Sequence, residues 1–149
     1  MNQRPSLTLR RHLKAAPDRV FRAWTVPEKM VRWWGTDGGP TKLAETDLQV
    51  GGAFRIGFHS SDGTYNEVGG VYREIVANER LVFTWAWHTT PERQSRVTIG
   101  LQPEGEGTML TLTHDMFVDE KARDDHRRGW TMALDRLEGV MAQPEGEQA

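Results

Sequence analysis

Two places in the sequence set a histidine beside carboxylates, the residue types that acid–base catalysis and metal binding use. They are His114-Asp115 and the run Asp124-Asp125-His126. A metal centre requires at least three converging ligands, and the chain has none of the spacings H-x-H, H-x-x-x-H or H-E-x-x-H. We therefore expect no metal site and no cofactor.

Nucleophilic catalysis also lacks its usual residues. The chain has no cysteine, which excludes thiolate chemistry, disulfides and cysteine-ligated metals, and it has no G-x-S-x-G motif. The glycine-rich segment G-T-D-G-G-P at 35–40 contains neither the lysine of a phosphate-binding loop nor G-x-G-x-x-G spacing. We interpret this segment as a mobile flap beside the mouth of a cavity.

Three polar residues stand in phase with apolar residues on predicted strands. Tyr72 and Glu74 share the parity of Gly70, and His114 shares the parity of Leu112. If both faces point inward, a phenol, a carboxylate and an imidazole line an otherwise apolar pocket, and a few such groups orient a small molecule. The alternative for Glu74 is an outward orientation and a structural pair with an arginine.

Five aromatic residues are candidates for the walls and floor of such a pocket. Any one such residue is more often plain hydrophobic core than a ligand contact, and the sequence leaves both possibilities open. The candidates are Phe54, Phe58, Trp85, Trp87 and Trp130.

The adjacent pair Trp33-Trp34 poses a geometric question. Thr25 and Glu28 have the spacing of a capping box, with Pro27 in the first turn, so the pair is expected near the end of a short helix. Adjacent helical residues point about 100° apart, so the two indoles cannot fill one narrow stripe. Both are candidate cavity residues: we expect Trp34 to pack the helix against a sheet and Trp33 to lie at the cavity rim or in a subunit contact.

The elements that position these residues follow from periodicity. Alternating apolar residues predict a first strand near Leu7 and about six strands between Thr41 and His114, with two short helices before Thr41. A long helix is expected from an N-cap at Asp119 to about Ala142. An antiparallel sheet with one apolar face must be covered, and this helix is long enough to do so, which predicts an α+β fold.

The predicted long helix has one unusual residue. Its apolar positions are Trp130, Ala133, Leu134, Leu137 and Met141. Gly129 lies in its interior, where glycine costs about 1 kcal/mol relative to alanine. We therefore expect this turn to pass close to another backbone or to the cavity edge.

Composition bounds the class of protein. The chain has 149 residues, 37% of them hydrophobic, and a formal net charge of −2, which argues against a dedicated nucleic-acid binder. No apolar run approaches the length of a membrane span or signal peptide core. We expect a cytoplasmic protein with one domain over residues 1–143 and a disordered tail at 144–149.

Several segments, in order along nearly the whole chain, carry a resemblance to a known family. They are P-D-R-V-F-R-A-W-T-V-P (17–27), W-W-G (33–35), V-G-G-A-F (50–54), G-V-Y-R-E-I (70–75), E-R-L-V-F-T-W (79–85), G-T-M-L-T-L-T-H (107–114) and H-R-R-G-W (126–130). The sequence resembles the Hsp90-ATPase-activator-like domains of the START-like superfamily, also called SRPBCC. The resemblance implies a helix-grip fold, in which a curved antiparallel sheet wraps around a long C-terminal helix and two short helices follow the first strand.

The resemblance also implies a cavity between sheet and helix that takes apolar or amphipathic small molecules, including lipids. We therefore expect a ligand-binding protein, monomeric or homodimeric, with an apolar small molecule as its partner. Two alternatives remain open. One is an interaction module that modulates a chaperone ATPase in a stress response, with the chaperone as partner. The other is a cyclase- or hydrolase-like enzyme that uses Glu74 or His114 as a general base.

Overall fold

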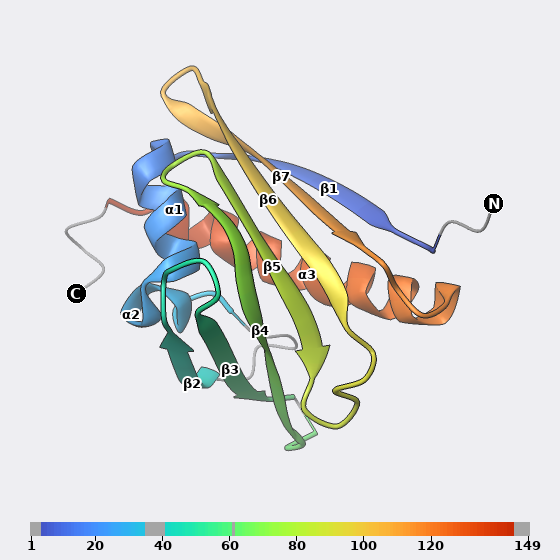
Figure 1. Cartoon of the computed structure of the whole chain (residues 1–149). Helices are drawn as coiled ribbons and strands as arrows, with labels where there is room; N and C mark the ends of the chain where they lie inside the picture. The colour runs from blue at the N-terminus through green and yellow to red at the C-terminus, as the bar shows by residue number, and fades with distance from the viewer. Residues whose placement is uncertain (1–3, 35–40, 61, 145–149) are drawn as a thin grey trace.

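The computed structural model describes residues 4–34, 41–60 and 62–144, and within them the strands form one antiparallel sheet (Figure 1). The strand order across the sheet is β1-β7-β6-β5-β4-β3-β2. In chain order the strands are β1 (Leu7–Leu13), β2 (Thr41–Thr46), β3 (Ala53–His59), β4 (Tyr65–Val76), β5 (Arg80–Trp87), β6 (Ser95–Glu104) and β7 (Gly107–Asp115). Strands β2 to β7 follow one another across the sheet, and β1 pairs with β7.

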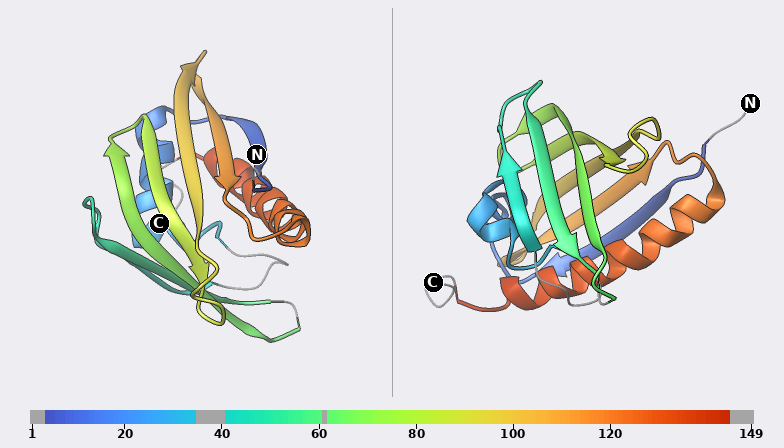
Figure 2. Two further views of the ribbon diagram at one scale, coloured as in Figure 1. Left: turned by 45° about the vertical axis from the view of Figure 1, so that its right-hand side comes forward. Right: turned by 90° about the horizontal axis from the view of Figure 1, so that it is seen from below.

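The helices of the described residues are α1 (Pro17–Thr25), α2 (Pro27–Met30) and α3 (Glu120–Met141). The sheet curves, α3 crosses its concave side, and α1 and α2 lie near the C-terminal end of α3 (Figure 2). The Asp119 side chain accepts a hydrogen bond from the Ala122 amide at 2.8 Å, so the predicted N-cap is confirmed. This is the predicted helix-grip arrangement.

The core lies between the inner face of the sheet and α3. Leu81, Phe83 and Trp85 alternate along β5 and are at most 4% exposed. The buried residues of α3 are Trp130, Ala133, Leu134, Leu137 and Met141, the set that the helical spacing predicted. The alternate residues of β5 and the residues on one face of α3 therefore form one apolar layer.

A β-bulge in β4 changes the face that Glu74 occupies. Tyr72 lies opposite Phe83 on β5. Glu74 then lies opposite Val82, so the register shifts by one residue between Tyr72 and Glu74. Directly opposed residues point to the same face, and the shift turns Glu74 outward, where its carboxylate lies 3.0 Å from Arg80 Nε. The prediction that Glu74 points inward is wrong, because the parity rule assumes an unbroken ladder.

Trp33 is enclosed between α1 and Trp34. Its side chain is fully buried, and its indole N–H donates to the Ala23 carbonyl at 2.8 Å. Its ring centroid lies 4.6 Å from that of Trp24 and 4.7 Å from that of Trp34. The predicted position at a rim or in a subunit contact is wrong, because α1 covers the flank of α2 that the sequence left open.

The predicted capping box at the start of α2 is also wrong. Thr25 is the last residue of α1, and its hydroxyl donates to the Phe21 carbonyl at 2.9 Å. Val26 takes the N-cap position of α2 without a side-chain hydrogen bond, and Pro27 begins the helix. Thr25 and Glu28 have the spacing of a capping box, but the Thr25 hydroxyl is hydrogen-bonded within α1 and does not cap α2.

Two further expectations from the sequence concern membrane-spanning helices and the segments at 35–40 and 144–149. Among the described helices, none combines the length and the apolar character that a bilayer span requires. The predicted flap at 35–40 and residues 145–149 of the predicted tail lie outside the described residues.

We expect Trp33→Ala to destabilise the protein strongly, because it removes a fully buried indole and leaves a cavity between α1 and Trp34. The free energy of unfolding, measured by urea denaturation, should fall by about 3–5 kcal/mol. Val50→Ala is the control: Val50 is 66% exposed, and such a change should stay within about 0.5 kcal/mol. A similarly small loss for Trp33→Ala would contradict the enclosed position.

Candidate functional site: a pocket between the sheet and the last helix

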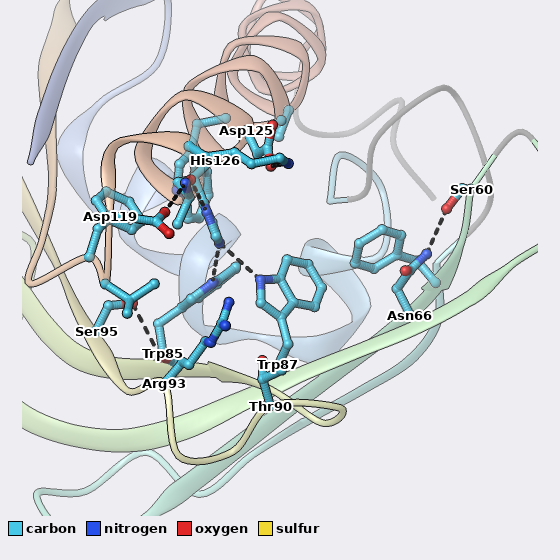
Figure 3. A pocket seen from close by; sticks show the side chains of 18 of the residues that line it. Ser60, Asn66, Trp85, Trp87, Thr90, Arg93, Ser95, Asp119, Asp125 and His126 are labelled. Carbon is cyan, nitrogen blue, oxygen red and sulfur yellow. Dashed lines mark hydrogen bonds and ion pairs between the residues drawn. The ribbon is translucent and has the colours of Figure 1, made fainter. Parts of the chain in front are cut away.

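A pocket of about 430 Å³ opens between the sheet and the N-terminal half of α3 (Figure 3). Strands β3 to β6, the connections that follow β5 and β7, α3 itself and Trp34 all contribute to its lining. Gly129, whose place in the helix interior was unexplained, lines the pocket. A volume of this order lies within the range typical of small-molecule sites.

Five of the aromatic residues singled out in the sequence form the apolar wall of this pocket. They are Trp34, Phe58, Trp85, Trp87 and Trp130. The rings of Trp85 and Trp130 lie 5.0 Å apart, and the ring of Trp34 stacks 6.1 Å from that of Trp85. The wall thus joins β5, α3 and the segment after α2 in one continuous aromatic surface.

Phe54 and Tyr72 belong to a separate aromatic cluster with Phe83 and are not among the lining residues. The Phe54 ring lies 5.0 Å from that of Phe83 and 5.7 Å from that of Tyr72. Burial, and secondarily the charge of Asp47, raise the pKa of Tyr72 to about 12. This cluster is core packing beneath β3 and β4, and the expectation that its members line the cavity is wrong.

Glu74 lies outside the pocket, on the opposite face of the sheet, where it pairs with Arg80. Its side chain is 47% exposed. A carboxylate in this position cannot abstract a proton from a molecule between the sheet and α3. The structural pair with an arginine, left open as the alternative, is the arrangement that forms.

His114 is buried behind the pocket wall, and both ring nitrogens are engaged. Nδ1 accepts a hydrogen bond from the Trp130 indole at 3.0 Å, which places the ring proton on Nε2. Nε2 then donates to Ser95 Oγ at 2.7 Å, and Ser95 Oγ donates to the Trp85 carbonyl at 3.2 Å. Burial, followed by the nearby His126, lowers the pKa of His114 well below its ordinary value. His114 points inward as expected, but it supports the wall and is not a lining residue.

His126 is a pocket residue that the sequence analysis considered only as part of a possible metal cluster. Its Nδ1 donates to the Ala122 carbonyl at 2.7 Å, so Nε2 is the acceptor. Nε2 receives the Trp87 indole N–H at 2.9 Å and the Trp85 indole N–H at 3.2 Å. Burial lowers the pKa of His126. Its spacing of four residues from Trp130 places both on one helix face and was the signal that could have revealed it.

The rim of the pocket carries polar and charged side chains from loops and strand ends. Asp125 pairs with Lys121 at 2.8 Å and with Arg128, and the Lys121 ammonium lowers the pKa of the Asp125 carboxyl. On the far side, Asn66 Nδ2 donates to Ser60 Oγ at 2.7 Å. Arg93 reaches the pocket from the β5–β6 connection. Arg93 and Ser60 lie in connections, which have no periodicity, so sequence spacing could not find them.

Metal binding finds no support in the arrangement of the described side chains. In residues 4–34, 41–60 and 62–144, no three His, Asp or Glu side chains come together as a metal site requires. Asp124, Asp125 and His126 do not converge, because the carboxylates face solvent and the imidazole faces the indoles.

The family of this chain follows from a comparison with family models. The model for activator of Hsp90 ATPase homolog 1-like proteins matches residues 14–142, which include every element of the pocket. The chain belongs to this family. No curated protein is detectably similar to it in sequence.

Solved structures of similar chains share the fold. A protein from Chromobacterium violaceum is 28% identical, with a TM-score of 0.83 over 94% of this chain and 99% of that one. The AHSA1 protein from Silicibacter pomeroyi is 26% identical, with a TM-score of 0.81 over 93% of this chain and 98% of that one. CalU16 from Micromonospora echinospora is 30% identical, with a TM-score of 0.68 over 96% of this chain and 79% of that one. The chain thus has the overall architecture of other family members.

We expect the free energy of unfolding to fall as the pH drops below about 6.5, the ordinary histidine pKa. His114 and His126 have lowered native pKa values, so the unfolded chain takes up protons that the native imidazoles do not. This contribution is complete above the ordinary pKa and is lost as the pH falls toward the lowered native values. Urea denaturation at about pH 7.5, 6.5 and 5.5 measures it.

His126→Asn is the matched variant for this measurement. It removes one titrating imidazole while keeping a polar side chain, so the decline between those pH values should become shallower. A wild-type stability that stays level down to about pH 5.5 would show that the two imidazoles are not held neutral.

Proposed function

We propose that this protein binds an apolar or amphipathic small molecule in the pocket between the sheet and α3. The observation that carries the proposal is a volume of about 430 Å³ with an aromatic wall of Trp34, Phe58, Trp85, Trp87 and Trp130. Indole and phenyl faces gain most from flat aromatic or extended hydrocarbon partners, because these bury the largest apolar area against them. The polar rim then holds the hydrated end of such a molecule near solvent.

The hydrogen bonding of the wall favours a binding role over catalysis. Both imidazoles near the pocket use both ring nitrogens in hydrogen bonds with indoles, a serine or the backbone. A general base needs a free lone pair within reach of the proton that it takes. Glu74, the other candidate base, lies on the outer face of the sheet beside Arg80. A wall in which the Trp85, Trp87 and Trp130 indoles are held by imidazoles suits a receptor for a preformed shape.

The test compares two glycine substitutions on the same helix. Gly129 lines the pocket, whereas a Cβ at the exposed Gly139 would meet no atom within 4 Å. Both Gly129→Leu and Gly139→Leu gain helix propensity of about 1 kcal/mol, but only the first fills the pocket. We expect Gly129→Leu to weaken binding of the neutral fluorescent probe N-phenyl-1-naphthylamine at least about tenfold, which corresponds to about 1.4 kcal/mol.

Two measurements report on this binding. Probe fluorescence should rise and saturate with wild type and Gly139→Leu, and the probe should raise their melting temperatures in a concentration-dependent way. Equal affinity of both variants would place the probe elsewhere, and the absence of saturable binding to wild type by a panel of apolar compounds would refute the proposal.

A further inference from the structure

We propose that the ligand of this pocket is an amphipathic anion, whose acidic group meets Arg93 and the Trp85 indole N–H while its apolar body lies on the aromatic wall. This inference rests on the proposed binding function and specifies the chemical class of the ligand. It follows from two features of the pocket: a charged donor that has no side-chain partner among the described residues, and one acceptor nitrogen that two donors share.

Arg93 is the charged donor. It is an exposed residue that lines the pocket from the β5–β6 connection, and its side chain points from the rim toward Trp85 and His126 (Figure 3). The other charged lining residues, Asp119, Lys121 and Asp125, are each engaged by hydrogen bonds or ion pairs. For the Arg93 side chain, the described residues provide neither. A guanidinium offers five N–H donors in a planar fork that matches a carboxylate.

The crowded acceptor is His126 Nε2. Both indoles donate to it, Trp87 at 2.9 Å and Trp85 at 3.2 Å, but an imidazole nitrogen has one lone pair. Nδ1 cannot accept a hydrogen bond from either indole, because it carries the proton that is donated to the Ala122 carbonyl. The longer bond makes the Trp85 N–H the more weakly satisfied of the two, and Trp85 lines the pocket. An acceptor oxygen on a ligand would satisfy it.

The two carboxylates that line the pocket, Asp119 and Asp125, would repel a bound anion only weakly. Asp119 accepts from the Ala122 amide at the N-terminus of α3, where the helix dipole offsets negative charge. Asp125 is held by Lys121 and Arg128, which compensate its charge. The negative charges that line the pocket are therefore each offset, whereas the guanidinium of Arg93 has no counter-charge among the described residues, and a neutral apolar ligand would leave it so.

The experiment uses two probes of nearly the same shape, 2-naphthoate and its neutral analogue 2-naphthamide, at about pH 7.5, where the carboxylate is ionised. Isothermal titration should show that wild type binds the anion about tenfold more tightly than the amide. Arg93→Gln keeps an uncharged donor and should reduce this preference to within about twofold while leaving the affinity for the amide unchanged. Raising the salt concentration should weaken binding of the anion alone.

Arg127→Gln is the matched control. Arg127 follows His126 on α3 and is exposed, but it does not line the pocket. It removes the same charge from the same region and should leave the anion preference intact. Melting curves verify that both variants fold, and the salt dependence of wild type tests the inference without any variant.

The outcomes separate this inference from the proposed function. Saturable binding of both probes to wild type with equal affinity, or an equal loss of both in Arg93→Gln, would refute the anion and leave the pocket function standing. If the preference for the anion falls as much in Arg127→Gln as in Arg93→Gln, the preference arises from general charge attraction. That result would also refute a role for Arg93. Failure of both probes and of the neutral naphthylamine to bind would overturn the function and the inference together.

Discussion

The contact of Trp130 with the aromatic residues around it holds the structure together. Its ring lies 5.0 Å from that of Trp85 on β5, 5.7 Å from that of Trp34 and 5.9 Å from that of Trp24 on α1. Trp33 and Trp87 join the same network through Trp24 and Trp85, so all six tryptophans of the sequence pack in one cluster. Aromatic pairs add about 0.5–1.5 kcal/mol each beyond their buried area. One residue of α3 thereby ties the long helix to the sheet and to both short helices.

Large aromatic rings bring a second constraint, because each buried indole carries an N–H that must find an acceptor. Two imidazoles meet this need for three indoles: His114 accepts from Trp130, and His126 accepts from Trp85 and Trp87. The Ala23 carbonyl accepts from Trp33, whereas the Trp24 N–H has no acceptor among the described residues. Burial keeps both imidazoles neutral, and only a neutral imidazole has a lone pair to accept with. The wall of the pocket is therefore apolar toward the cavity, and its Trp85, Trp87 and Trp130 indoles are hydrogen-bonded to imidazoles. Such a wall keeps its shape when the cavity is empty.

The division of the pocket into wall and rim follows from where its residues sit. The wall residues lie on β3, β5, α3 and the segment after α2, whose positions the core fixes. The charged and polar rim lies on the connections, at the start of β4 and on the first turns of α3. The core thus fixes the shape of the pocket, whereas the rim side chains would set the proposed preference for one ligand class.

The sequence by itself determined the element order, the α+β class, the core residues of α3 and the N-cap at Asp119. These features depend on local periodicity and on hydrogen bonds between near neighbours. It also supplied most of the aromatic wall, because alternation in β5 puts Trp85 and Trp87 on one face.

Only the tertiary structure decided the rest. A bulge in β4 turned Glu74 to the outer face of the sheet. One extra residue in a strand reverses the inward and outward alternation of the residues after it, and the sequence pattern of β4 does not reveal it. Helix α1 enclosed Trp33, since the packing of one helix on another depends on contacts that local spacing does not encode. His126 and Arg93 became pocket residues because elements about 40 residues apart in sequence, such as β5 and α3, meet across the cavity.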